Sequence, residues 1–232
     1  LTTVGTPMTR QLNQPEESSP MVDVAAAARR LSEALITRQL DGDIASATAA
    51  ELVTIAARVE QEPARSKAEN FGLRNRITSF METGVWPDPP PDGSKLEFDV
   101  ASVIGGNLNP ASVGAEYFRD GNEVIGRVNV GRCFEGPPER VHGGIICALF
   151  DEVMGAVFRA NGTASAFTGE LAVRFEAPCP VGVDLEFRAR QVGESGRKRF
   201  LEGEAKSPDG RFASATATFI EMRIDHFVDT AE

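Results

Sequence analysis

The sequence predicts an α+β fold in which an antiparallel sheet wraps around one long central helix. Two observations lead to this prediction. Several segments between residues 123 and 222 alternate apolar and polar residues, as half-buried strands do. One apolar run, residues 143–160, lacks this alternation and interrupts the strands. Because short turns join most of the later strands, neighbouring strands are expected to be antiparallel, and the sheet can bury the helix by curving around it.

The N-terminal part of the chain, residues 22–83, is expected to be a helical extension, and no chemistry is assigned to it. Apolar residues recur at steps of three and four in residues 22–40 and again between 44 and 59. Asp43 is the predicted N-cap of the second helix, and a third, weaker helix is expected over 66–82. The first apolar stripe consists of Val24, Ala28, Leu31 and Leu35.

Composition marks the borders of the domains. Residues 1–21 are rich in Thr, Pro and Gln and lack the apolar segment of a secretion signal, so a disordered tail is expected. Residues 84–95 hold four prolines and two glycines and are predicted to be a stiff linker. A domain is expected over 96–222 and a C-terminal tail over 223–232.

The domain at 96–222 is expected to contain strand, strand, helix and then four strands. A strand near 113–118 is expected to pair with the first alternating segment across the turn "RDGN". The alternating segments are 123–130, 167–177, 183–192, 198–206 and 211–222.

Charge and cysteine content narrow the functional classes. A net charge of −10 and a pI near 4.9 argue against a nucleic-acid-binding or peripheral membrane protein. No apolar run reaches transmembrane length, so no membrane span is expected. The three cysteines are not at metal-ligand spacing, and their odd number favours reduced thiols in the cytoplasm. No metal and no redox cofactor are expected.

The start of the predicted helix 143–160 carries the first chemical signal. Gly143 and Gly144 sit where helical amides have no partner within the helix and point outward with partial positive charge. Glycine also lets a ligand approach these amides closely. Such a helix end can hold an anion or polarise a carbonyl oxygen.

Asp151 is the unexpected carboxylate of this apolar helix. It shares one face with small residues, which leaves room for a ligand or another helix. An unpaired buried charge is costly, so Asp151 is either functional or a structural residue held by hydrogen bonds, and the pattern alone leaves both open. The small residues are Gly144, Cys147, Ala148 and Gly155.

Gly143 and Asp151 of one chain cannot act on the same carbonyl group. Eight residues at about 1.5 Å each separate them by about 12 Å along the helix. A nucleophile and an oxyanion donor must both lie roughly 3 Å from the reacting group. If both are catalytic, the site therefore combines Gly143 of one chain with Asp151 of another, which predicts a homodimer or a dimer of dimers.

Three sequence segments together resemble the hotdog-fold acyl-CoA thioesterases. The similarity covers about residues 105–222 and leaves the N-terminal helices outside it. It is strongest for the subgroup with an "FEGPP…VHGG…D" motif followed by "T-x-x-L-x-x-x-[FY]-x-x-P-x-P". The segments are "FEGPPERVHGGIICALFDEVMG" (134–155), "TGELAVRFEAPCPVG" (168–182) and "GRKRFLEGEAKSPDG" (196–210).

The resemblance implies hydrolysis of an acyl-CoA thioester, hence a role in lipid metabolism, with coenzyme A as part of the substrate. Asp151 matches the carboxylate that activates water or attacks the thioester, and the amide of Gly143 matches the oxyanion donor. Thr168 matches the hydroxyl that orients the water or the carboxylate, although strict strand alternation would make it polar surface. His142 matches a positioning residue, or it only shapes the turn. Some relatives carry Asn or Gln near the place of Gly136, so that auxiliary role is either unfilled here or taken by another residue.

The phosphates of coenzyme A require basic residues. Arg197, Lys198 and Arg199 open a predicted strand and either bind a phosphate or form a solvated hairpin end. Arg174 is a second candidate, and Gly144 is expected to contact substrate at the helix end.

Three other functions compete with hydrolysis. The chain could bind acyl-CoA without turnover, or act as a hotdog hydratase or dehydratase, although those relatives use a histidine base in a different motif. Alternatively, the N-terminal helices bind a protein partner while the hotdog domain dimerises.

Overall fold

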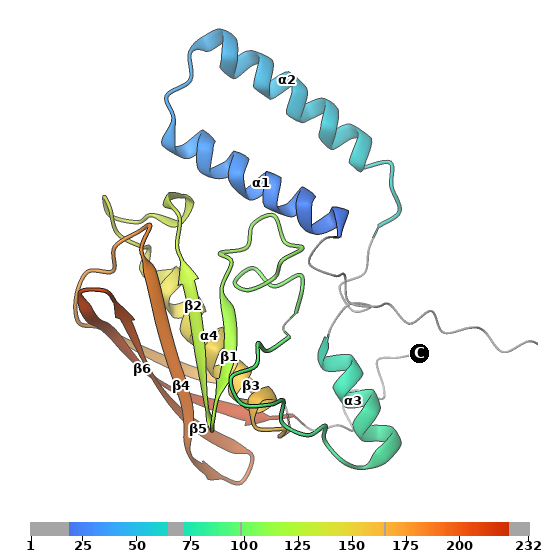
Figure 1. The fold of residues 1–232 in the computed structure, drawn as a ribbon, viewed down its shortest axis with the longest axis vertical. Helices are drawn as coiled ribbons and strands as arrows, with labels where there is room; N and C mark the ends of the chain where they lie inside the picture. Colours follow the sequence, from blue (N-terminus) through green and yellow to red (C-terminus); the bar gives the residue numbers. More distant parts are fainter. Residues whose placement is uncertain (1–18, 65–71, 98, 165, 223–232) are drawn as a thin grey trace, which may run out of the picture.

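The computed structural model describes residues 19–64, 72–97, 99–164 and 166–222 (Figure 1). The expected tails at 1–21 and 223–232 lie outside these residues, apart from 19–21. The helices are α1 (Pro20–Thr37), α2 (Gly42–Val59), α3 (Gly72–Thr83), the 3-10 helix η2 (Arg132–Phe134) and α4 (Gly143–Ala160). The strands are β1 (Glu116–Asp120), β2 (Glu123–Asn129), β3 (Ala166–Phe175), β4 (Asp184–Ser195), β5 (Lys198–Ser207) and β6 (Gly210–Glu221).

The strands form one antiparallel sheet in the order β1-β2-β4-β5-β6-β3. Helix α4 packs against the inner face of this sheet, behind the strands in Figure 1. The predicted α+β fold, with a sheet around one central helix, is therefore confirmed. Strand β3 lies at an edge, and its partner is β6.

The core forms between α4 and the strands because the apolar residues of the helix pack against the inward-facing apolar residues of the strands. Helix α4 is apolar on most sides, and Phe150, Val153 and Met154 are fully buried. In β4, alternate residues such as Phe187 point inward and the residues between them point outward. The rings of Phe150 and Phe187 meet edge to face with centroids 5.1 Å apart, a preferred aromatic geometry.

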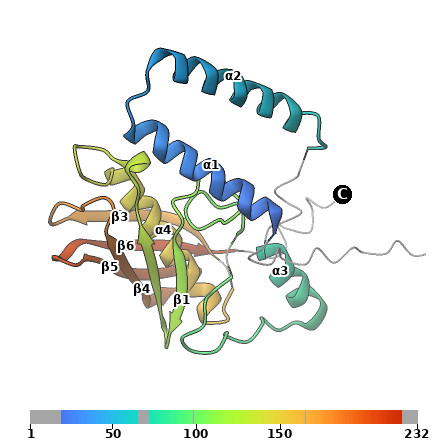
Figure 2. The same cartoon turned by 45° about the horizontal axis from the view of Figure 1, so that its top comes forward.

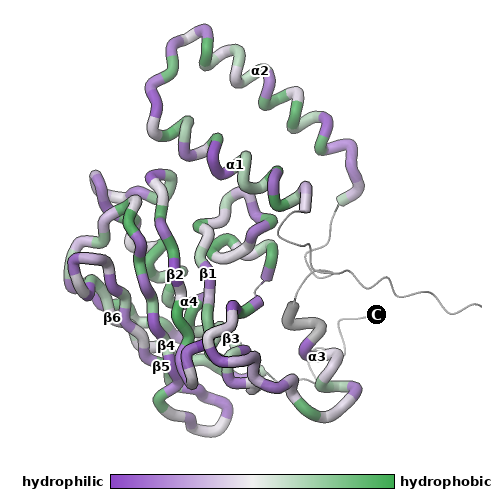
Figure 3. The backbone as a smooth tube through the Cα atoms, viewed as in Figure 1, coloured by the Kyte–Doolittle hydropathy of each residue, from purple (hydrophilic) through white to green (hydrophobic). Residues whose placement is uncertain are grey.

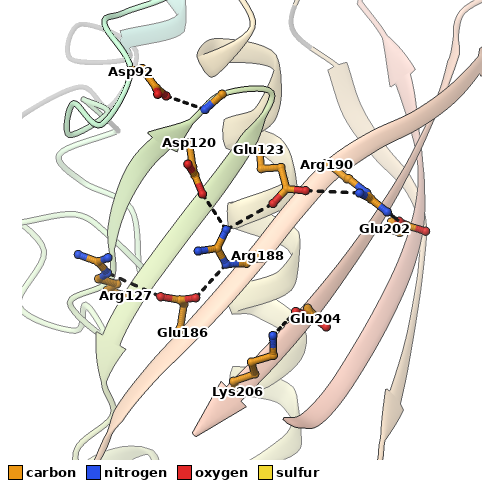
Figure 4. Close-up of polar contacts among 11 residues, drawn as sticks. Asp92, Asp120, Glu123, Arg127, Glu186, Arg188, Arg190, Glu202, Glu204 and Lys206 are labelled. Atoms are coloured by element: carbon orange, nitrogen blue, oxygen red, sulfur yellow. Dashed lines mark hydrogen bonds and ion pairs between the residues drawn. The ribbon is translucent and has the colours of Figure 1, made fainter. Parts of the chain in front are cut away.

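The outer face of the sheet is a cross-strand network of ion pairs (Figure 4). Arg188 bonds to Asp120 and Glu186, and Arg190 bonds to Glu202 on the neighbouring strand. The hydrogen bonds that Arg188 donates, first to Asp120 and then to Glu186, raise the pKa of Arg188 above its usual value. Exposed pairs of this kind each contribute about 0–1 kcal/mol, so this face is a solvated surface that depends little on any one pair.

The first two helices begin earlier than predicted, and the first also ends earlier. Helix α1 spans Pro20–Thr37 rather than 22–40, and α2 begins at Gly42. Asp41, not Asp43, is the N-cap of α2, because its side chain accepts hydrogen bonds from the amides of Asp43 and Ile44. A capping residue must precede the first helical residue, and Asp43 lies already inside the helix. None of the described helices is both long and apolar enough to cross a lipid bilayer.

Helix α1 lies between α2 and the sheet domain in both views (Figures 1 and 2). Its apolar stripe is only partly covered, since Val24 is 61% exposed and Leu35 is 41% exposed, whereas Ala28 and Leu31 are half-buried. The face that meets the domain carries Ala25, Arg29 and Glu33. Figure 3 shows apolar and polar residues mixed along both helices. The helical period predicted α1, but not the face by which it docks.

The proline-rich segment 84–95, which the sequence predicted to be a stiff linker, is hydrogen-bonded to the β1–β2 hairpin. The amide of Gly93 donates to the carbonyl oxygen of Arg119 at 2.9 Å, and the amide of Gly121 donates to Asp92. Helix α3 precedes this segment at Gly72–Thr83, and the start predicted for it at residue 66 lies outside the described residues. Prolines therefore stiffen a segment that lies along the sheet edge.

Candidate active site

The start of α4 presents one amide that has no acceptor within the described part of the chain. His142 is the N-cap, and its Nδ1 accepts a hydrogen bond from the amide of Gly144 at 3.0 Å. Its carbonyl oxygen accepts the amides of Ile145 and Ile146. The Gly143 amide is thus the free donor at this end, whereas the Gly144 amide, expected to contact substrate, is already bonded.

The hydrogen bond from Gly144 also defines the state of the His142 ring. Because Nδ1 accepts, it carries no proton, and a neutral ring then has its proton on the exposed Nε2. His142 therefore bonds to the backbone at the start of α4.

Gly136 packs directly against His142. A Cβ atom at this position would lie 3.0 Å from the His142 Cα, closer than most real contacts. Position 136 thus has no room for an Asn or Gln while His142 stays where it is. In the sequence, Gly136 stands where some relatives have a polar side chain. In the structure, a small residue is favoured there because it packs against His142.

Asp151 lies in the middle of α4 and is held by a hydroxyl from β3. The Thr168 Oγ1 donates a hydrogen bond to the Asp151 Oδ1 at 2.5 Å. Asp151 is half-buried, while Leu149, Phe150 and Val153 on the other sides of α4 are buried. The structure therefore joins two of the expected catalytic residues on the one open face of the helix.

The small residues around Asp151 form this open face, which we call the α4 stripe. Its other members are Gly144, Cys147, Ala148 and Gly155, and each of them is half-buried or exposed. Burial raises the pKa of the Cys147 thiol, so this thiol is protonated at neutral pH and is a poor nucleophile. Asp151 is thus the ionisable group of the α4 stripe that is suited to activate water.

A β-bulge turns Thr168 toward the helix. Thr168 pairs with the buried Phe219, but the register shifts at Gly169 so that Glu170 pairs with Thr218 on the outer face. Strict alternation had put Thr168 and Glu170 on the same polar side, and the bulge makes this expectation wrong. A glycine inside a strand pattern is the sequence signal of such a bulge.

The basic residues proposed for coenzyme A do not lie together. Arg174 pairs with Ser214 on the outer face of the sheet, the face opposite Asp151. Arg199 is bonded to Glu221 and is largely buried, so it is not free to hold a phosphate.

The other two basic residues, Arg197 and Lys198, are exposed at the β4–β5 turn. Thr168 lies level with this turn across the sheet, because it pairs with Phe219 and Phe219 pairs with Arg199. Two strand spacings make this separation about 10 Å. Arg197 and Lys198 are therefore the exposed cations at the same end of the sheet as Thr168.

Glu152, the residue after Asp151, has a structural role. It is mostly buried and accepts hydrogen bonds from the hydroxyls of Ser102 and Tyr117. Burial raises the pKa of Glu152, although hydrogen bonds from Ser102, Tyr117 and the Gly105 amide act to lower it. Glu152 therefore fastens the loop before β1 to α4 and faces away from Asp151.

The raised pKa of Glu152 predicts a pH-dependent stability. The usual pKa of this side chain is 4.5. At pH values just above 4.5, Glu152 is therefore more often protonated in the folded chain than in the unfolded chain. The folded state then binds more protons, so the free energy of unfolding falls as pH rises through this interval. Glu152→Gln is expected to flatten this fall at pH values above 4.5, measured by urea unfolding. An unchanged slope would contradict the assignment, whatever the absolute stability of the variant.

The open side of α4 and the free edge of the sheet adjoin each other. Phe175 on β3 lies beside the helix start, where its Cζ is 3.4 Å from the position of a Cβ on Gly143. Phe175 is 53% exposed and Phe167 at the other end of β3 is 56% exposed. Since α4 is one continuous helix from Gly143 to Ala160, Gly143 and Asp151 remain about 12 Å apart within one chain.

Comparisons with known proteins agree on one family. A family model of the thioesterase superfamily matches residues 139–214. Acyl-coenzyme A thioesterase THEM4 of Xenopus laevis is 32% identical over 167 residues, which are 65% of this chain and 74% of the relative. The crystal structure of a thioesterase superfamily protein is 24% identical with a TM-score of 0.71, and the match covers 90% of this chain and 95% of that chain. At 24% identity, this structural similarity shows that the two chains share a fold.

Proposed function

Because the chain belongs to the thioesterase superfamily, we propose that it hydrolyses an acyl-CoA thioester to a free acid and coenzyme A. The observation that carries this proposal is the hydrogen bond from Thr168 to Asp151 on the open face of α4. It holds a carboxylate at a surface that a substrate can reach. The relative named as an acyl-coenzyme A thioesterase supports the choice of substrate class.

Asp151 supplies the base or the nucleophile of the proposed reaction. As a base it takes a proton from water while the water oxygen attacks the thioester carbonyl carbon. As a nucleophile its own oxygen attacks, and water then hydrolyses the resulting anhydride. In both routes the carbon–sulfur bond breaks and the thiolate of coenzyme A leaves and takes up a proton. Thr168 orients the carboxylate in either route.

The Gly143 amide stabilises the negative charge that develops on the carbonyl oxygen. It lies at the positive end of the α4 dipole, and it has no acceptor among the described residues. Since one chain cannot bring Gly143 and Asp151 to the same carbonyl, we propose a site shared by two copies of the chain. Two-fold symmetry then gives two such sites per dimer.

A phosphate of coenzyme A is proposed to bind near Arg197 and Lys198. Both are exposed at the sheet end that carries Thr168. Charge-assisted bonds from such side chains suit a phosphate.

Release of free coenzyme A thiol from a panel of acyl-CoA substrates tests this function. The panel contains short-, medium- and long-chain and aromatic acyl groups. We expect turnover of at least one class, which would identify the acyl group. Binding of the same substrates without turnover would contradict hydrolysis and favour an acyl-CoA-binding protein.

Thr168→Val is expected to lower kcat by about tenfold, because it removes the hydroxyl that orients Asp151 while it keeps the shape of the side chain. Thr168→Ser retains a hydroxyl and should recover most of the activity. Thr216→Val, on the exposed outer face of β6, is the matched control and should behave like the parent. Full activity of Thr168→Val would contradict the proposal that the Thr168 hydroxyl orients Asp151.

A further inference from the structure

Helix α1 caps a 3-10 helix that lies far away in the sequence. The carboxylate of Glu33 accepts hydrogen bonds from the amides of Arg132 at 3.0 Å and Cys133 at 3.1 Å. These amides begin η2, whose own N-cap, Gly131, makes no side-chain capping bond. Free amides at a helix start favour a negative charge, and Glu33 supplies that charge from about 100 residues earlier in the chain.

The Glu33 carboxylate lies in close contact with the residues at the start of η2. A Cβ atom at Gly131 would lie 2.7 Å from the Glu33 Oε2, so any other residue there would make the carboxylate shift from its present position. Desolvation acts to raise the pKa of Glu33, but the bonds from the Cys133 and Arg132 amides outweigh it and lower the pKa below the usual value. Glu33 is thus ionised when it accepts both amides at neutral pH.

The other end of η2 holds the start of α4. The carbonyl oxygen of Phe134, the last residue of η2, accepts the amide of His142 at 2.9 Å. The loop between them is closed by an antiparallel bridge between Glu135 and Val141. His142 in turn holds the amide of Gly144, one residue beyond the proposed oxyanion donor. Hydrogen bonds at both ends of η2, together with the short backbone of η2 between them, therefore join Glu33 to the start of α4.

We propose that Glu33 is a positioning residue of the active site, and that α1 is a working part of the catalytic unit. This inference rests on the proposed hydrolysis for its kinetic effect. Through η2 and Phe134, Glu33 holds His142 and hence the direction of the Gly143 amide. The sequence alone predicted no chemical role for the N-terminal helices, because neither their composition nor the family motifs indicate this contact.

Two variants on different elements test this role. Glu33→Gln puts an amide donor where both oxygens accept, and Gly131→Ala places a Cβ against the carboxylate. Each is expected to lower kcat by about tenfold and to change KM by less than about twofold, because the oxyanion donor is misdirected while substrate contacts remain. Glu51→Gln on the exposed side of α2 is the matched control. The double variant should lose little more than either single one, because both changes remove the same contact.

Amide hydrogen exchange gives a readout that does not depend on turnover. We expect faster exchange at Gly144, as well as at Arg132 and Cys133, in both variants and not in the control. Faster exchange confined to Arg132 and Cys133, with kcat at the parent level, would overturn the proposal and leave Glu33 as a docking residue only. If the parent turns over no acyl-CoA, hydrolysis fails, and unchanged exchange at Gly144 would separately overturn the coupling.

Discussion

Asp151→Asn is expected to lower kcat for acyl-CoA hydrolysis by about a thousandfold, because the carboxamide can neither take a proton from water nor attack the thioester. The substitution keeps the size of the side chain. Its amide oxygen can still accept the Thr168 hydroxyl, so the fold and the α4 stripe should be preserved. KM should change little, since the lost interaction belongs to the transition state.

The matched control for Asp151→Asn is Glu170→Gln. Glu170 is a carboxylate on the same strand as Thr168, but the bulge places it on the outer face of the sheet. The control should retain parent activity. Circular dichroism and size-exclusion chromatography would establish that both variants are folded and of parent size. Equal turnover of Asp151→Asn and the parent would exclude Asp151 as the catalytic group.

Gly143→Pro is expected to lower kcat by about a hundredfold, because proline removes the amide hydrogen proposed to stabilise the oxyanion. Residue 143 is the first helical position, where proline is well tolerated. The preceding residue, His142, has φ −61° and ψ 132°, a conformation that residues before proline favour. The variant should therefore fold while it lacks one donor.

Gly143→Ala is the control for the added side chain. A Cβ there meets the Phe175 ring at 3.4 Å, which is ordinary van der Waals contact, and the amide hydrogen remains. We expect activity within about threefold of the parent. A similar loss in Gly143→Ala and Gly143→Pro would point to crowding beside Phe175 and not to a lost donor.

The sequence was a good guide where one periodic pattern decided the structure. The bounds of α4, Gly143–Ala160, agree with the prediction, because a long apolar run with glycines at its start has few other solutions. Strands β4 to β6 also lie where alternation placed them. Asp151 and Thr168 were selected by family resemblance, and the structure brings them into contact.

Features that depend on packing between distant segments were beyond the sequence. Alternation assigned Thr168 to the surface, because Gly169 signals only that a bulge can form there and the pairing of β3 with β6 decides that it does. The sequence predicted Arg199 to be a phosphate ligand or part of a solvated hairpin end, and its bond to Glu221, on the neighbouring strand β6, could not be predicted. The docking face of α1 carries Glu33, because it meets backbone amides.

The measurement that tests the central claim most directly is the activity of a mixed dimer of Asp151→Asn and Gly143→Pro chains. The two chains are co-expressed with different tags, and dimers carrying both tags are isolated. In a site shared by two chains, one of the two sites then receives an intact Asp151 and an intact Gly143, so about half of the parent kcat should return. A mixed dimer no more active than its parent variants, or a chain that forms no dimer, would contradict the shared site.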